Sequence, residues 1–410
     1  MSKCSCENCN LEVFENSDKC ILHCEKDDWY SVDKRWNGKY LIFFWNELKE
    51  KTRNEISIVE KENPKLIKYN FEEIILIEMI FPYINYDDFN FFKELGIKKI
   101  NFIKCKFKEK ITYTYFENIE EVIFKETFFD KDVIYSNENI LKEVEFINCK
   151  FYKNFNISST IFNKTANFTQ SKFNEVEFNS TIFKKEVFFN QTIFDNKLNL
   201  EKTFFYEKVN FHKIECKSIV NRETARIIKD SFEQQNNIIE ANKFYALEMK
   251  AREDELERDI REGKNFFEWL VFKIHGLSSN HSQDWLLALF WILNITFSLL
   301  TTQESMKIFG NSLVAYIPII TMIVLGVITS NIDDKKSLTI FLFLITFLNY
   351  GVFKIISKEH SLDCISQKIN PFSIMTELSN IDFVTFVYKI IIAYLIYQFI
   401  VSIRQNTRRK

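Results

Sequence analysis

Large apolar residues recur through residues 144–216 at steps of five or six positions, which is neither the period of a helix nor that of a simple strand. The series is Phe146, Phe151, Ile157, Phe162, Phe168, Phe173, Phe178, Phe183, Phe189, Phe194, Leu200, Phe205, Phe211 and Cys216. A smaller or β-branched residue stands two positions before nearly every one. This pattern predicts a coil with short flat faces, whose large side chains point to the axis and whose small ones fit the corners. A four-sided turn takes about 20–22 residues, so stacked coils bury continuous columns of Phe.

A coarser repeat of 22 residues continues the pattern upstream, with copies that begin at Ile100, Val122 and Val144. Its spacing of apolar residues is similar to that of a divergent leucine-rich repeat, and the stretch that starts at Phe71 is an expected first strand. We therefore expect one continuous solenoid over residues 70–217, with leucine-rich-like or irregular coils over 70–143 and the finer repeat over 144–217. Residues 31–69 would form its N-terminal cap.

Charge-poor apolar segments occur only in the last third of the chain. They are Trp285–Thr302, Ser312–Ser330, Ser337–Ile356 and Phe383–Ile403 (285–302, 312–330, 337–356 and 383–403). Each is long enough to cross a bilayer, so we expect a four-helix transmembrane domain over 281–403. The N-terminus carries no secretory signal, and the tail 404–410 is basic. These features predict a multi-pass protein whose two termini are cytoplasmic.

The segment 218–280 joins the two regions. It has no Gly or Pro between Asn221 and Glu262, and its apolar residues recur at roughly helical spacing. Asn236 and Asn237 interrupt this pattern, which indicates a helical hairpin with a turn at that point. A solenoid leaves an unpaired edge at its last coil, so the hairpin is expected to cap that end.

Closely spaced cysteines open the chain, in the run CSCENCNLEVFENSDKCILHC over residues 4–24. Cys6 and Cys9 form a C-x2-C pair, and Cys20 and Cys24 form a second pair beside His23. Two such pairs supply the four ligands of a structural zinc site, which would provide the folding energy of a segment too short for a core of its own. Spacing leaves open whether His23 or Cys24 is the fourth ligand, and whether Cys4 replaces Cys6. We thus expect a zinc-binding cluster over residues 1–30.

Composition and charge exclude several functional classes. The net charge of -2 supplies no field that attracts nucleic acid, and residues 144–216 hold ten Lys against eight Asp and Glu, which excludes an acidic DNA mimic. The chain has only seven Gly and five His. No phosphate-binding glycine loop or nucleophilic triad stands out, so we expect no catalytic residues, no further cofactor and no enzymatic activity.

Lys389 is the single charged residue inside the fourth apolar segment. A cation within a membrane is costly, so it is a candidate for a functional charge. Alternatively, Lys389 lies within one or two turns of the outer interface and reaches water there, or pairs with Asp382 or Glu377.

Residues 144–216 resemble a pentapeptide-repeat domain, and the layout of the chain resembles bacterial pentapeptide-repeat membrane proteins. The resemblance is carried by the repeat register, the run CILHCEK (Cys20–Lys26), the linker that begins RETARIIKDSFEQQNN at Arg222, and the tail YKIIIAYLIYQFIVSIRQNTRRK. It implies a right-handed β-helix, a location in the bacterial inner (cytoplasmic) membrane, and no enzymatic activity.

Two hypotheses of function follow. The first is a membrane-anchored cytoplasmic scaffold whose solenoid face binds a protein partner, because repeats provide an extended surface. The second is a multi-span sensor or channel-like protein that its solenoid regulates, which Lys389 and the several spans would favour. Either protein contacts the lipid bilayer, and either is compatible with a homo-oligomer.

Overall fold

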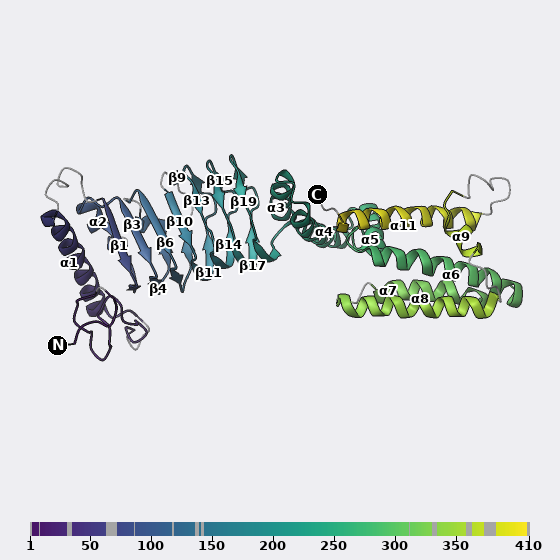
Figure 1. The fold of residues 1–410 in the computed structure, drawn as a ribbon, viewed down its shortest axis with the longest axis horizontal. Helices are drawn as coiled ribbons and strands as arrows, with labels where there is room; N and C mark the ends of the chain where they lie inside the picture. The colour runs from purple at the N-terminus through teal and green to yellow at the C-terminus, as the bar shows by residue number, and fades with distance from the viewer. Residues whose placement is uncertain are drawn as a thin grey trace. The chain divides into compact units, whose positions relative to one another are not determined.

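The computed structural model of the protein describes residues 2–7, 9–30, 35–62, 72–85, 87–116, 119–135, 139–140, 143–310, 312–329, 334–357, 363–372 and 383–407. These residues fall into two compact units, Met1–Asn237 and Ile238–Lys410. The first unit contains all the described strands, and the second is helical (Figure 1).

The first unit is a parallel β-solenoid of about 6 turns, which confirms the predicted fold class. Its strands are β1 (Glu73–Ile77), β2 (Ile80–Phe81), β3 (Lys99–Ile103), β4 (Lys106–Phe107), β5 (Ile111–Thr112), β6 (Glu121–Lys125), β7 (Phe128–Phe129), β8 (Val133–Ile134), β9 (Asn139–Ile140), β10 (Glu143–Ile147), β11 (Lys150–Asn156), β12 (Ile161–Phe162), β13 (Ala166–Asn167), β14 (Lys172–Glu177), β15 (Ile182–Phe183), β16 (Val187–Phe188), β17 (Ile193–Asn199), β18 (Phe204–Phe205), β19 (Val209–Asn210) and β20 (Glu215–Ile219). Its helices are α1 (Gly38–Glu62), α2 (Asn90–Glu94), the 3-10 turn η2 (Tyr113–Phe116) and α3 (Arg222–Gln234).

The strands form three sheets that run along the solenoid. One has the order β1-β3-β6-β10-β13-β16-β19, a second follows β2-β4-β7-β11-β14-β17-β20, and a third follows β18-β15-β12-β9. Ile100 pairs with Val122 and Val122 pairs with Val144, which is the register expected from the 22-residue repeat.

Stacked phenylalanines fill the interior of the solenoid. In one ladder the centroids of neighbouring rings are 4.9–5.9 Å apart, and its members are Phe102, Phe124, Phe146, Phe168, Phe189 and Phe211. A second ladder has centroid distances of 4.5–5.7 Å, and its members are Phe81, Phe107, Phe129, Phe151, Phe173 and Phe194. These distances follow the strand separation of about 4.8 Å, so identical residues in register stack without strain.

Left-handed residues form one column of corners along the whole solenoid and a second column along its later coils. The first consists of Glu78, Lys104, Glu126, Asn148, Gln170, Gln191 and Lys213, and the second of Ser159, Ser180 and Lys202. Except after Glu78 and Lys213, where Met79 and Ile214 follow, the next residue is small, buried and able to donate a hydrogen bond. Thr181 Oγ1, for example, donates to Ile157 O over 2.6 Å, and Ser171 Oγ donates to Phe146 O over 2.7 Å. Each such bond ties one coil to the preceding coil.

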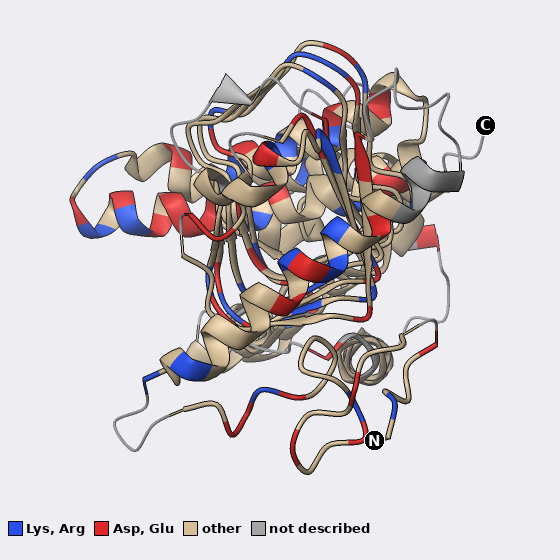
Figure 2. Cartoon of the chain, turned by 90° about the vertical axis from the view of Figure 1, so that its left-hand side faces the viewer, with Lys and Arg blue, Asp and Glu red and all other residues tan. Residues whose placement is uncertain are grey.

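Charged residues of both signs lie along the outer surface of the coils (Figure 2). They form ion pairs between neighbouring coils: Lys99 Nζ is 2.6 Å from Glu121 Oε1 and 3.7 Å from Glu73 Oε1. Exposed pairs of this kind contribute little stability, but they place opposite charges next to each other on neighbouring strands of the sheet.

Helix α3 covers the C-terminal end of the solenoid. The side chain of Asn221 caps the helix by accepting a hydrogen bond from Thr224 N over 2.9 Å. Thr224 Oγ1 in turn accepts from Leu200 N over 2.9 Å, and Ser231 Oγ donates to Val209 O over 3.2 Å. Backbone groups of the last coil, which have no further coil to pair with, are thereby satisfied.

The helical unit contains α4 (Ile238–Arg261), α5 (Phe266–Ser279), α6 (Trp285–Phe309), the 3-10 turn η3 (Leu313–Tyr316), α7 (Ile317–Thr329), α8 (Lys335–Ser357), α9 (Asp363–Ile369) and α11 (Phe383–Thr407). Among the described residues, three helices are long and apolar enough to cross a membrane, namely α6, Ser337–Ser357 of α8, and α11. The second of the four expected segments forms η3 and the 13-residue α7, because Pro318 lacks the N–H that a continuous helix would need.

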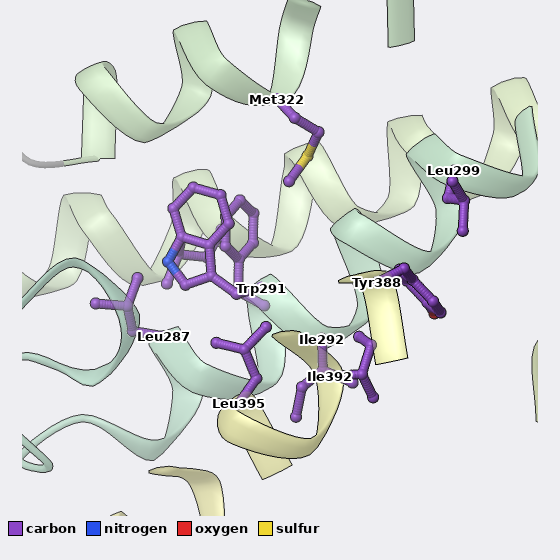
Figure 3. Packing of buried hydrophobic residues seen from close by; sticks show 10 residues of the cluster. Leu287, Trp291, Ile292, Leu299, Met322, Tyr388, Ile392 and Leu395 are labelled. Carbon is purple, nitrogen blue, oxygen red and sulfur yellow. The ribbon is translucent and has the colours of Figure 1, made fainter. Parts of the chain in front are cut away.

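Helix α6 is the centre of this unit and packs against both α8 and α11. Leu287, Trp291 and Ile292 of α6 belong to one buried cluster with Met322 of α7, and with Tyr388, Ile392 and Leu395 of α11 (Figure 3). Polar contacts accompany this packing. Asn294 Nδ2 donates to Thr346 Oγ1 of α8 over 2.8 Å, and the hydroxyls of Thr296 and Tyr388 are 2.9 Å apart.

Candidate metal centre

Residues 3–24, which we call the N-terminal knuckle, form two tight turns that face each other. In the first, Lys3 pairs with Glu12, and Cys4 N donates to Leu11 O over 2.9 Å. In the second, the backbone N–H groups of His23 and Cys24 both donate to Cys20 O, over 3.0 Å and 2.9 Å. These turns present thiols from both sides to a common point.

Four buried side chains meet at that point: Cys4, Cys9, Cys20 and His23. Their ligand atoms all lie within 4.8 Å of one another. Cys9 Sγ is 3.7 Å from Cys20 Sγ, and His23 Nδ1 is 3.7 Å from Cys4 Sγ and 3.0 Å from Cys20 Sγ. The described cysteines form no disulfide, so the thiols are available to hold a metal ion.

The hydrogen bonds around the cluster orient its ligands. His23 Nε2 is 3.1 Å from Ile77 O, and because a carbonyl only accepts, the ring donates there and directs the lone pair of Nδ1 to the thiols. Burial lowers the pKa of His23 to about 4, so the imidazole is neutral at pH 7, as metal binding requires. Burial raises the pKa of Cys20, and a bound cation would offset that cost.

A buried lysine lies beside the turn that carries Cys20, His23 and Cys24. Lys26 Nζ donates to Ile21 O over 2.8 Å and to Cys24 O over 2.6 Å, and it lies 4.6 Å from the centroid of the Trp29 ring. Burial lowers the pKa of Lys26 to about 8. The ammonium group thus fixes the turn that carries Cys20 and His23.

The structure brings together one of the ligand sets that sequence spacing left open. Cys9 and Cys20 lie in the cluster as expected, and they are joined by Cys4 and His23. Cys6 and Cys24 lie outside it: Cys6 is half-buried, and Cys24 Sγ is 3.5 Å from Lys26 Nζ. Sequence spacing could not distinguish Cys4 from Cys6, or His23 from Cys24, since either residue of each pair can be presented by the same tight turn.

Lys389 is buried, with 4% of its surface exposed. Its ammonium group donates to three backbone carbonyls at the C-terminal end of α9, namely those of Gln367 (2.9 Å), Lys368 (2.9 Å) and Asn370 (2.7 Å). A cation at this end of a helix satisfies carbonyls that have no partner within the helix. Asp382 and Glu377, the alternative partners, lie outside the described residues.

A second polar cluster, which sequence reasoning missed, lies between α5 and α6. It contains His275, His281, Ser282 and Gln398, and all but His275 are almost fully buried. The signal was available in the sequence, because His281 lies within the polar run SSNHSQD between two apolar segments and His275 lies just before it.

Comparison with known proteins gives no match: no family model, no curated protein and no solved structure is significantly similar to this chain.

Proposed function

We propose that this protein is a membrane-anchored scaffold without catalytic activity, whose solenoid holds a protein partner near the membrane. The observation that supports this proposal is the union of a β-solenoid and three membrane-length apolar helices in one chain. A solenoid offers a long, regular surface for binding, and several apolar helices provide a stable anchor. Membership of the pentapeptide-repeat family, and a location in the bacterial inner membrane, are part of the same proposal.

The docking point that we propose is a shallow hollow on the sheet that contains β4, β7 and β11. It is lined by Lys106, Phe128, Asp130 and Tyr152. Tyr152 is 52% exposed, and Lys150 Nζ lies 5.3 Å from the centroid of the Phe128 ring. Exposed aromatic side chains flanked by charges are typical of residues that dominate protein interfaces.

Crosslinking of the tagged chain in its native membrane, followed by mass spectrometry, tests this proposal. We expect a near-stoichiometric partner whose capture falls at least tenfold in Tyr152→Ala. Tyr206→Ala is the matched control, because Tyr206 is 73% exposed and lies outside the hollow. If the wild-type chain crosslinks only to itself, the partner proposal fails, and a self-contained oligomer takes its place.

The anchor that we propose includes α5. The charged side chains of this helix are paired with α4: Lys273 Nζ is 2.5 Å from Glu253 Oε1 and 2.7 Å from Glu257 Oε1, and Glu268 binds Arg252. The opposite face of α5 exposes only apolar side chains, namely those of Phe266, Phe267, Leu270, Val271, Ile274 and Leu277. An apolar face beside neutralised charges fits the boundary between lipid headgroups and acyl chains.

The metal that we propose for the knuckle is zinc in a structural role. Zinc binds thiolates at about 2.3 Å and imidazoles at about 2.0–2.1 Å, so neighbouring ligands of a tetrahedral site lie roughly 3.5–3.8 Å apart. The Cys9–Cys20 and Cys4–His23 distances of 3.7 Å fit this range, although the Cys20–His23 distance of 3.0 Å is shorter. Four protein ligands close the coordination sphere, which favours a structural rather than a catalytic ion.

The alternative function, a sensor or channel, is less well supported. It rested on the several apolar segments, which an anchor would equally need, and on Lys389 as a functional charge, whereas the ammonium group of Lys389 caps α9. The scaffold proposal therefore has the stronger physical basis.

A further inference from the structure

Three consecutive residues between α5 and α6 have left-handed backbones although none is glycine. They are Asn280, His281 and Ser282, with φ values of 48°, 53° and 64°. A left-handed conformation is unfavourable for most residues with a side chain, so surrounding contacts must hold this turn in place. His281 and Ser282 are buried, at 4% and 3% exposure. We call residues 280–284 the α5–α6 turn.

A directed chain of hydrogen bonds connects the turn to the candidate span α11. Gln398 Oε1 accepts from Ser279 Oγ over 3.1 Å and from Ser282 Oγ over 2.9 Å. The one hydroxyl hydrogen of Ser282 is thereby used, so His275 Nε2, at 3.2 Å, must donate to Ser282 Oγ. A neutral His275 then has a bare Nδ1, which lies 3.2 Å from His281 Nδ1 and accepts from it. It follows that a neutral His281 has no hydrogen on Nε2.

The bare Nε2 of His281 is buried and has no hydrogen-bond partner among the described atoms. From α4, the carboxylate oxygen Oε2 of Glu253 lies 4.0 Å away. Lys273 of α5 binds the other oxygen of Glu253, and the ring of Phe272 is 4.4 Å from the imidazole, centroid to centroid. From α11, the neutral side chain of Gln398 is connected to His281 through hydrogen bonds of Ser282 and His275. The nitrogen without a hydrogen thus lies 4.0 Å from a carboxylate that is itself paired with Lys273.

We propose that His281 Nε2 is a proton-binding site, and that its protonation opens the α5–α6 turn and releases the α4–α5 hairpin from α11. In the closed turn an imidazolium would be buried beside His275 and Lys273, whereas in the open turn water solvates it. Opening also relieves the three left-handed residues. This inference does not depend on the partner or the metal of the proposed scaffold.

The direction of the effect follows from proton linkage. Burial lowers the pKa of His281 from 6.5 to about 4 in the closed turn, and the attraction of the Glu253 carboxylate offsets only part of this effect. An exposed imidazole keeps its ordinary pKa near 6.5, so the open form binds the proton more tightly. The closed turn is therefore stable above pH 6.5 and loses stability as the pH falls from 6.5 toward 4. Between pH 7.5 and pH 5, these two pKa values shift the equilibrium about 30-fold toward the open form.

Hydrogen exchange of the full chain in lipid nanodiscs tests this proposal. After correction for intrinsic exchange rates, amides of the α5–α6 turn should exchange about 30-fold faster at pH 5 than at pH 7.5. Amides of α8 in the same sample should not change, which excludes general unfolding. His281→Asn is the matched variant, because Asn tolerates the left-handed conformation and does not titrate. We expect its turn to be insensitive to pH.

Two outcomes would overturn the proposal: equal protection of the wild-type turn at both pH values, or a pH effect that persists in His281→Asn. Nitrogen NMR of the histidine rings in the wild-type chain provides a test that needs no variant. We expect His281 Nε2 to carry no hydrogen at pH 7.5 and to gain one on acidification. A hydrogen on that nitrogen at pH 7.5 would contradict the deduced chain of donors.

Discussion

At the scale of single residues, the corners of the solenoid divide into two chemical classes. Except for Met79 and Ile214 at the two ends of the solenoid, corners that follow a left-handed residue hold a donor, namely Cys105, Thr127, Cys149, Thr160, Ser171, Thr181, Thr192 and Thr203. Other corners hold aliphatic residues such as Val144, Ala166 and Val187. The five-residue pattern indicates only that these residues are small. The donor is needed because a buried carbonyl of the preceding coil would otherwise lack a partner.

Thr181→Val tests the role of this donor. The substitution keeps the shape of the side chain but leaves Ile157 O without the hydroxyl that donates to it over 2.6 Å. We expect the free energy of unfolding to fall by about 1–2 kcal/mol, measured by urea unfolding of the full chain in detergent micelles. Thr181→Ser retains the donor and should lose less. Equal midpoints for Thr181→Val and the wild type would show that the bond contributes nothing.

Substitution of single ligands distinguishes the two metal sets. We expect one equivalent of zinc per purified chain, determined by elemental analysis, and less than a tenth of that in Cys20→Ser, because three ligands bind zinc far more weakly than four. Cys24→Ser is the matched control and should retain the metal, since Cys24 faces Lys26 instead. Loss of metal from Cys24→Ser with retention in His23→Ala would instead favour the set with four cysteines.

At the scale of elements, the N-terminal knuckle covers the first coil of the solenoid, as α3 covers the last. His23 donates to Ile77 O over 3.1 Å, and Ile80 N donates to Leu22 O over 2.9 Å. Both contacts satisfy backbone groups of strands that begin their sheets, β1 and β2. The knuckle has too few apolar residues for a core, so the metal ion would hold this cap together.

Removal of the metal should therefore loosen one end of the solenoid and spare the other. After chelation, we expect hydrogen exchange to rise at least tenfold in residues 20–24 and in β1 and β2. Strands β17 and β20 should keep their protection because α3 still covers them. Unchanged protection of the knuckle after verified loss of metal would show that the ion does not hold this cap.

At the scale of the whole molecule, the helix directions decide how often the second unit crosses a membrane. Asn294 and Phe297 of α6 contact Thr346 and Phe353 of α8 in the same order, so these two helices are parallel. The chain must then return from the end of α6 to the start of α8, and the described elements between them are η3 and α7. Four residues of 3-10 helix and 13 of α-helix extend about 27 Å, close to the hydrocarbon thickness of about 30 Å.

The second unit thus predicts four crossings, with α7 as a short one. Helix α11 is antiparallel to α6, since Trp285 contacts Phe399 edge to face while Thr296 contacts Tyr388. We expect cysteine labels at Asp334 and Thr407 to react from one side of the membrane, and a label at Gly310 from the other, in a background without the native cysteines. Labelling of Gly310 and Asp334 from the same side would show that α7 does not cross.

Much of this architecture was predictable because it depends on local periodicity. The register that pairs Ile100 with Val122, and the apolar segments that became α6, α8 and α11, follow from spacing and hydropathy alone. The choice of Cys4 and His23 over Cys6 and Cys24 did not follow. It depends on how two turns face each other and on Ile77, a residue more than fifty positions away in sequence.

The amino-acid sequence by itself determined the coil, its period and the apolar helices, because each depends on contacts between residues at regular spacing. The tertiary structure decided which side chains meet in the candidate metal cluster, the partners of Lys389, the parallel course of α6 and α8, and the connection of His281 to Gln398. Each of these depends on the directions in which side chains from distant segments meet. The spacing of residues along the sequence shows where a polar residue stands, but not which carbonyl, thiol or imidazole its side chain will contact.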